Sequence, residues 1–203
     1  MNSYEKNNNF IDFKINGRLF PSWIAANFKK YKLDKIKKGS DPCNVTLKNE
    51  VLKMRPYQEF LTKYFDYKSP FKDILIYHGV GSGKTGATVN IYNALYNYDP
   101  AWNVFLLIPA ALKNDPWLKD IKKWLNKSEY SYRFKNIIFI HYDSPFAGKD
   151  FIDAVRRSDS SKKSLFIIEE VHNFIRNVYS NISSSKGKRA LTIYDYIVQQ
   201  KKD

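Results

Sequence analysis

The segment ILIYHGVGSGKTG, residues 74–86, decides the fold of this chain. Four apolar residues, Ile74–Tyr77, predict a strand, and they run into a glycine-rich loop that opens a helical pattern over residues 84–98. Glycines let the backbone of such a loop curl, so that successive N–H groups point inward. The start of the helix adds its positive end, and the two features together favour a bound phosphate group.

We expect this loop to bind ATP together with Mg²⁺. Lys84 would place a charge on the outer phosphates, and the Thr85 hydroxyl would face the metal ion. The residues that we assign to nucleotide binding here are Gly79, Val80, Gly81, Ser82, Gly83, Lys84, Thr85 and Gly86. The full textual pattern has a glycine where this chain has His78. The alternative is a chance glycine-rich turn, and the order of strand, loop and helix argues against it.

The composition restricts the class of protein. Lys and Arg number 34 and Asp and Glu number 20 among 203 residues, which gives a formal net charge of +14. Such a surplus favours a polyanionic partner such as nucleic acid, although a solubility role or a lysine-rich genome would also produce it. The single cysteine, Cys43, excludes a disulfide framework within the chain. No apolar run reaches the ~20 residues of a membrane span, so we expect no membrane partner and a cytoplasmic location.

Apolar segments alternate with helical patterns through most of the chain. We expect strands at 74–77, 104–108, 137–141 and 164–168, and helices at 55–66, 84–98, 115–126, 148–157 and 189–200. Strands that are apolar throughout and alternate with helices indicate an α/β fold, with a parallel β-sheet flanked by helices. Residues 1–50 predict an N-terminal arm, partly helical over Phe20–Lys32, and residues 51–203 predict the α/β domain, with a loop at Ser183–Lys188.

Two acids follow the last predicted strand. Glu169 and Glu170 come directly after Ser164–Ile168, and His172 is two residues further on. Hydrolysis at a phosphate-binding loop needs carboxylates at a neighbouring strand end. We therefore assign Glu169 to Mg²⁺ and Glu170 to activation of the attacking water, and we expect His172 to couple this site to its neighbours. The alternative is that the acids only begin the next helix, where negative charge is favourable.

The motifs resemble those of superfamily 2 helicases. Glu169–His172, EEVH, is similar to the DEAH-type box, and Met54–Gln58, MRPYQ, resembles the adenine-reading motif of the Swi/Snf-like branch. The resemblance implies a RecA-like P-loop NTPase domain that binds the nucleotide also through Arg55, Tyr57 and Gln58, with the Gln58 amide on the adenine edge. It further implies contacts to a nucleic-acid backbone after the strands at 104–108 and 137–141. The residues for these contacts are Pro109, Ala110, Lys113, His141, Tyr142 and Ser144.

A narrower resemblance covers residues 19–198. Segments such as ILIYHGVGSGKT, EEVHNFIRNVYSN and KGKRALTIYDYIV are similar to helicase-type proteins of nucleocytoplasmic large DNA viruses, such as African swine fever virus, and to the poxvirus early transcription factor small subunit. This resemblance implies a motor linked to viral transcription in the host cytoplasm or the virion. Double-stranded DNA is then the favoured nucleic acid, and an RNA polymerase or transcription factor subunit is an expected partner.

Two departures from the family pattern affect the expected activity. Glu169 stands where the family has aspartate, and the added methylene would shift a bound Mg²⁺. The sequence given ends at Asp203, before the Ser/Thr-Ala-Thr motif and the second motor domain with its arginine finger, which typically contributes ~10³–10⁵ in rate. We therefore expect these residues alone to bind ATP and to hydrolyse it poorly. The competing hypotheses are the motor of a restriction-type translocase and a non-catalytic ATP-sensing scaffold on a polymerase.

Several lysines and aromatic residues have two readings. Lys113, Lys119, Lys122 and Lys123 would line a nucleic-acid path or form an ordinary solvated face, and the sequence favours neither. The Tyr142 ring would stack on a base, although an interior position is the more common one for an aromatic residue at a strand end. Trp117 and Trp124 have the helical spacing of packing residues.

Overall fold

The computed structural model describes residues 20–33, 53–69, 71–79, 81–125, 129, 132–133, 137–184 and 187–200. The chain forms two compact units, Met1–Tyr98 and Asp99–Asp203, which are described one at a time. The expected boundary near residue 50 and the position of Cys43 lie outside the described residues.

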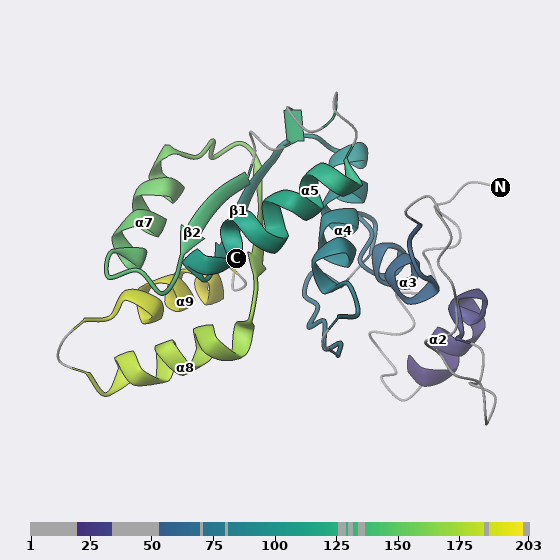
Figure 1. Cartoon of the computed structure of the whole chain (residues 1–203), viewed down its shortest axis with the longest axis horizontal. Coiled ribbons are helices and arrows are strands. Elements are labelled where there is room, and N and C mark those ends of the chain that lie inside the picture. The colour runs from purple at the N-terminus through teal and green to yellow at the C-terminus, as the bar shows by residue number, and fades with distance from the viewer. Residues whose placement is uncertain are drawn as a thin grey trace. The chain divides into compact units, whose positions relative to one another are not determined.

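The first unit is helical among its described residues. It contains α2 (Phe20–Asn27), a 3₁₀ turn (Lys29–Tyr31), α3 (Pro56–Tyr64) and α4 (Lys84–Tyr98) (Figure 1). Pro56 fits the first position of α3, where the missing N–H of proline costs no helical hydrogen bond. Aromatic rings join the arm to α3, because Phe28 meets the edge of Phe60 with 5.1 Å between ring centroids. Tyr64 extends this cluster by stacking on Phe71 at 4.9 Å.

The predicted strand at Ile74–Tyr77 is absent, and residues 71–79 have no regular secondary structure. A strand needs a neighbour to pair its backbone N–H and C=O groups. The described residues of the first unit contain no strand that would serve as this neighbour. Half-buried Ile74 and Ile76 alternate with exposed Leu75 and Tyr77, so the segment keeps the period of an extended chain.

The second unit is built on a three-stranded parallel sheet in the order β2-β1-β3. The strands are β1 (Trp102–Ile108), β2 (Ile137–His141) and β3 (Lys163–Ile168), and each lies at its predicted position or extends it by one or two residues. The central strand β1 is buried from Asn103 to Ile108, as its continuous apolar run predicts. The fold is therefore α/β with a parallel sheet, which is consistent with a RecA-like domain.

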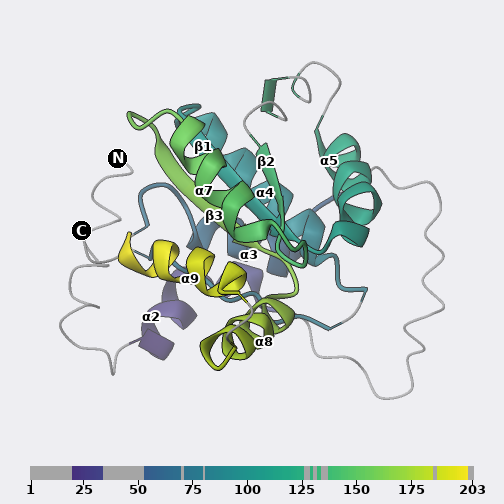
Figure 2. The same cartoon turned by 90° about the vertical axis from the view of Figure 1, so that its left-hand side faces the viewer.

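Helices α7 (Ala147–Arg157), α8 (Val171–Ile182) and α9 (Arg189–Gln199) complete the core of this unit. Figure 2 shows α7 lying across the sheet, with α9 and α8 below it and α5 (Lys119–Trp124) beside β2. Phe105 and Leu107 of β1 pack in one cluster with Phe151 of α7, Phe174 of α8 and Ile193 of α9. At ~25 cal/mol per Å², burial of such large apolar side chains stabilises the unit by roughly 2 kcal/mol each.

The segment after β1 differs from its prediction. A single helix was expected at 115–126, and the structure has a 3₁₀ turn (Ala110–Leu112), a wide π-helical turn (Lys113–Leu118) and then α5. Pro116 lies inside the wide turn and has no N–H for a regular helical hydrogen bond, which accounts for the irregular start. None of the helices that the structure describes has both the length and the apolar character needed to cross a bilayer.

Candidate functional site

The glycine-rich loop precedes α4 in the first unit. Gly81 and Gly83 adopt left-handed backbone conformations, with φ of 75° and 78°. The Ser82 hydroxyl donates to the Gly79 carbonyl at 2.8 Å, and the Lys84 ammonium donates to the carbonyls of His78 at 3.1 Å and Gly79 at 3.4 Å. The loop therefore curls around its own lysine. Val80 lies outside the described residues.

Helix α3 holds this loop through two side chains. The Tyr57 hydroxyl donates to the Ser82 carbonyl at 2.5 Å, and Gln58 Nε2 donates to the Gly83 carbonyl at 3.0 Å. At its other end, Gln58 Oε1 accepts from the Arg55 N–H at 2.8 Å and caps the helix. The buried Gln58 amide is thus used at both ends within the protein. The sequence suggested a nucleotide contact for these residues, and it did not predict that they hold the loop.

The first turn of α4 continues the loop. Thr85 is buried at 7% exposure, and the Gly86 carbonyl accepts a 2.7 Å hydrogen bond from Asn90. His78, on the other side of the loop, has a pKa below its ordinary value, first because burial disfavours its charged form and second because Lys84 is near. The histidine is therefore neutral at pH 7, which leaves the Lys84 ammonium as the cation of the described loop.

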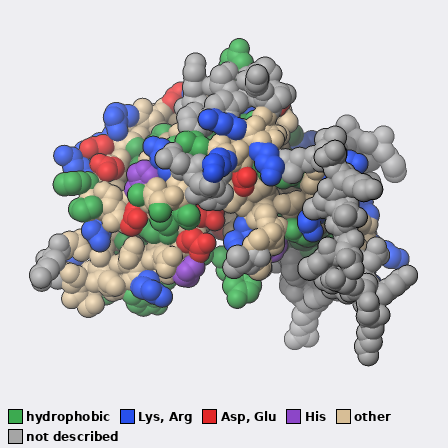
Figure 3. Space-filling model, in the orientation of Figure 1, with side chains coloured by type: hydrophobic (Ala, Val, Ile, Leu, Met, Phe, Trp, Pro, Cys, Tyr) green, Lys and Arg blue, Asp and Glu red, His purple; other side chains and the backbone are tan. Residues whose placement is uncertain are grey.

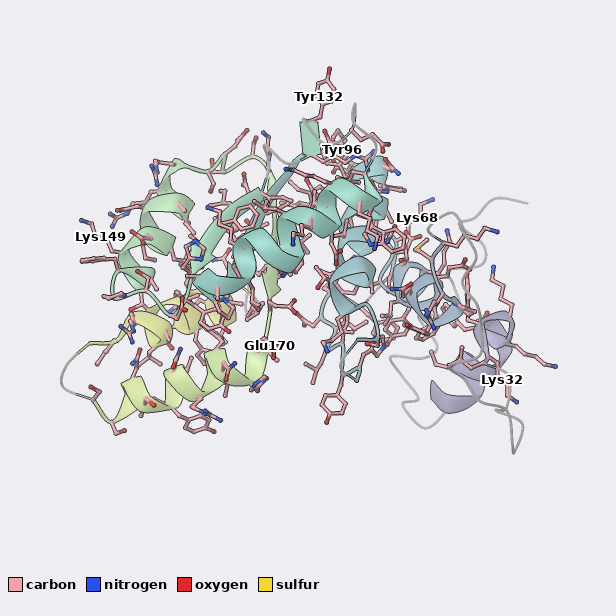
Figure 4. All side chains as sticks on the ribbon, in the orientation of Figure 1. Lys32, Lys68, Tyr96, Tyr132, Lys149 and Glu170 are labelled. Atoms are coloured by element: carbon pink, nitrogen blue, oxygen red, sulfur yellow. The ribbon has the colours of Figure 1, made fainter. Side chains whose placement is uncertain are left out.

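The acidic turn, Glu169–Glu170, lies between β3 and α8 in the second unit (Figure 4). The Glu169 N–H donates to the Leu107 carbonyl at 2.9 Å, which ties the turn to β1. Glu170 has φ and ψ of 49°, a left-handed conformation, at the N-cap of α8. Its Oε2 lies 3.3 Å from Nδ1 of His172. Helix α8 begins directly after the two acids, as the alternative interpretation requires. The structure is therefore compatible with both interpretations, a catalytic pair of acids and the start of a helix.

The residues predicted to contact nucleic acid follow β1 and β2. The strands are parallel and in register, with Ile108 opposite His141 and Leu107 opposite Ile168, so all three strands end at one edge of the sheet. Pro109 and Ala110 follow β1 at this edge, and Ser144 closes the turn after His141 through a 3.0 Å backbone hydrogen bond. Lys113 places its ammonium 5.2 Å from the centre of the Phe139 ring.

The ring of Tyr142 is buried in the core at 1% exposure, which agrees with the interior reading. It cannot stack on a base without leaving that core. The neighbouring Asp143 was not among the predicted site residues. Its carboxylate accepts from the Ala110 N–H at 3.2 and 3.3 Å and joins the segments after β1 and β2. An acid two residues after the end of a predicted strand was the signal that would have found it.

Basic side chains mark two surfaces of the second unit. Lys119, Lys122 and Lys123 are exposed on α5, and Figure 3 shows blue side chains gathered over this helix. Trp117 is fully buried and Trp124 half-buried, as their spacing predicts. A cavity of about 760 Å³ between α7, α8 and α9 has cationic side chains in its lining, together with exposed Phe146, and it was not predicted. These cationic side chains are Lys149, Arg156, Lys188 and Arg189.

The comparisons with known proteins place these features in a family. The family model described as "type III restriction enzyme, res subunit" (ResIII) matches residues 51–194. A protein named as an ATP-dependent RNA helicase of Acanthamoeba polyphaga mimivirus is 50% identical over 213 aligned residues, which cover 100% of this chain and 26% of that protein. Nucleoside triphosphatase I of Melanoplus sanguinipes entomopoxvirus is 31% identical over 87% of this chain and 27% of that protein.

The chain thus spans about a quarter of the length of the curated relatives named here. The matched region includes the glycine-rich loop of the first unit and the acidic turn of the second. The chain belongs to the ResIII family, whose members have a RecA-like domain of the helicase superfamily.

Proposed function

We propose that this chain is the ATP-binding first motor domain of an ATP-driven nucleic-acid helicase or translocase of viral type. The observation that carries the proposal is the glycine-rich loop, in which Gly81 and Gly83 are left-handed and Lys84 lies within the curve of the backbone. The family and the names of the viral relatives support the same activity.

In this proposal the loop binds the phosphates of ATP, and the acidic turn supplies the carboxylates that its hydrolysis requires. Lys84 binds the outer phosphates, and Arg55, Tyr57 and Gln58 contribute to binding beside the adenine. Hydroxyl and carboxylate oxygens are the ligands that Mg²⁺ prefers, so the Thr85 hydroxyl and the Glu169 carboxylate are each of a type that suits this ion. A magnesium ion would supply charge neutralisation at the phosphates. Glu170 takes the proton of the attacking water, and His172 holds the Glu170 carboxylate from the side.

The proposed nucleic-acid surface is the edge of the sheet where the strands end. Pro109, Ala110, His141 and Ser144 lie at this edge, and the exposed lysines of α5 add positive charge. Double-stranded DNA remains our proposal for the nucleic acid, and the name of the mimivirus relative makes RNA the alternative to test. A viral RNA polymerase or transcription factor subunit is the proposed protein partner, and the host cytoplasm or the virion is the proposed location.

The test measures ATP binding on this chain and ATP turnover on the complete polypeptide that its reading frame encodes. We expect Lys84→Ala to remove binding of a fluorescent ATP analogue, because the phosphates lose their main side-chain charge. Glu170→Gln should keep binding and lower turnover by ~10²-fold or more, because the general base is lost. Double-stranded DNA and single-stranded RNA, added separately, should differ in how far they stimulate turnover.

Tight ATP binding with no turnover under any of these conditions would refute the motor proposal. That outcome would favour the scaffold alternative, in which Glu169 reflects relaxed metal chemistry. Unchanged ATP binding by Lys84→Ala would instead refute the assignment of the loop.

A further inference from the structure

The acidic turn has an unfavourable backbone conformation at its centre. Glu170 is the only non-glycine residue with positive φ among those that the structure describes. For an L-residue this conformation costs roughly 1–2 kcal/mol, so the surrounding structure must hold it in place. The conformation also sets the direction in which the Glu170 side chain leaves the backbone.

The hydroxyl of Tyr142 holds this turn. It lies 3.1 Å from the Glu169 carbonyl and 3.4 Å from the Glu170 carbonyl, and a phenol has one proton to share between them. The shorter contact is thus the main hydrogen bond. A phenol is protonated at neutral pH, so the Tyr142 hydroxyl donates this bond.

The tyrosine itself is fixed by the core. Its ring is 1% exposed and meets Phe174 of α8 edge-on, with 5.5 Å between ring centroids. Its backbone N–H donates to the Ile108 carbonyl at the end of β1. The carboxylate of the next residue, Asp143, accepts a hydrogen bond from the Ala110 N–H. One short segment after β2 therefore holds both the backbone after β1 and the acidic turn after β3.

We propose that Tyr142 is a positioning residue for ATP hydrolysis: its hydroxyl holds the left-handed turn and thereby aims the Glu170 carboxylate. The inference rests on the proposed function, in which Glu170 activates the attacking water. Tyr142 contacts neither nucleotide nor nucleic acid in this role, because its hydroxyl is used on the backbone of the turn.

The experiment is Tyr142→Phe in the complete polypeptide, which removes one oxygen and keeps the ring. We expect kcat for ATP hydrolysis to fall about tenfold and KM for ATP to change less than about twofold, because misaligning a catalytic base affects the chemical step. The matched control is Tyr196→Phe, the same change in a ring that packs on Phe151 and Phe166 in the same core. The control should keep kcat. Rates are divided by the fraction of protein that binds ATP.

A Tyr142→Phe protein with the kcat of the unmodified protein would overturn the inference and leave the proposed function intact. A fall that the ATP-binding fraction fully explains, or an equal fall in Tyr196→Phe, would also overturn it, since the hydroxyl would then serve stability alone. No turnover in the unmodified protein would overturn the proposed function and this inference together.

Discussion

Replacing Gly83 with alanine probes the contact between the glycine-rich loop and α3. A Cβ at this position would lie 2.9 Å from Nε2 of Gln58, closer than side-chain carbons approach nitrogen, and φ is +78°. The variant therefore meets two penalties. The backbone is strained for any residue with a Cβ, and the Gln58 amide must leave its place.

Both penalties can be given a magnitude. Left-handed φ costs an L-residue roughly 1–2 kcal/mol. Moving the Gln58 amide breaks its 3.0 Å hydrogen bond to the Gly83 carbonyl and disturbs a group with 4% exposure, which costs roughly 1–2 kcal/mol more. We expect Gly83→Ala to lower the free energy of unfolding of the first unit by about 2–4 kcal/mol and to weaken ATP binding.

Two other glycines of the same loop separate the two penalties. Gly81 has φ of +75° and no atom within 4 Å of an added Cβ, so Gly81→Ala should show the strain alone, about 1–2 kcal/mol. Gly79 has neither a left-handed φ nor a neighbour within 4 Å, so Gly79→Ala should be neutral or slightly stabilising. The assay is urea unfolding, with hydrogen exchange of α3 and α4 peptides to assign the change to the first unit. Equal unfolding free energies for the three variants, or a Gly79→Ala variant that is the least stable, would refute this reasoning.

Three further predictions concern nucleotide preference, nucleic-acid binding and the pH dependence of stability. Gln58→Ala should reduce the preference for ATP over GTP, because the amide is assigned to the adenine edge. If the binding of both nucleotides weakens equally and the free energy of unfolding falls, Gln58 serves only to hold the loop. Lys122→Glu on α5 should weaken nucleic-acid binding and reduce its salt dependence. The control is Lys162→Glu, which lies just before the start of β3, at the edge of the sheet where the strands begin, and it should change neither quantity. Equal effects of the two variants in a salt titration would contradict the proposed surface. Because the pKa of His78 is lower in the folded chain, the unfolded chain binds more protons as the pH falls below ~6.5, and the free energy of unfolding should decrease there. Between pH 7.5 and 5.5, this free energy should decrease less in His78→Gln than in the unmodified protein. An equal decrease in the two proteins would contradict the prediction.

Sequence patterns predicted the second unit closely because its three strands contain continuous apolar runs, although only the central strand β1 is buried along its length. The run at Ile137–His141 has the predicted bounds, and β1 and β3 are longer by one or two residues. The prediction of a strand at Ile74–Tyr77 was wrong, because a run of apolar residues does not show whether a neighbouring strand is available to pair with it. Helix α8 was expected only under the alternative interpretation of the two acids and without bounds, although Phe174 and Val178 have the spacing of one buried helical face.

The candidate site was predicted in composition and only partly in geometry. Glycines and a lysine before a helix specify a phosphate-binding loop, so Gly81, Gly83 and Lys84 could be named from sequence. The hydrogen bonds of Tyr57 and Gln58 to that loop, and of Tyr142 to the acidic turn, join residues about 25 positions apart. No local pattern reports such contacts, because they depend on how the elements pack.

The central position of β1 has a consequence for synthesis on the ribosome. Its first partner, β2, follows it closely, but its second partner begins at Lys163, roughly 60 residues after the start of β1. At typical elongation rates of ~5–20 residues per second, β1, which is apolar from Val104 to Ile108, has one edge without its partner strand for several seconds until β3 is made. Nascent chains that are stalled between residues 141 and 163 should therefore bind chaperones and aggregate. Chains that are allowed to complete β3 should no longer bind chaperones or aggregate.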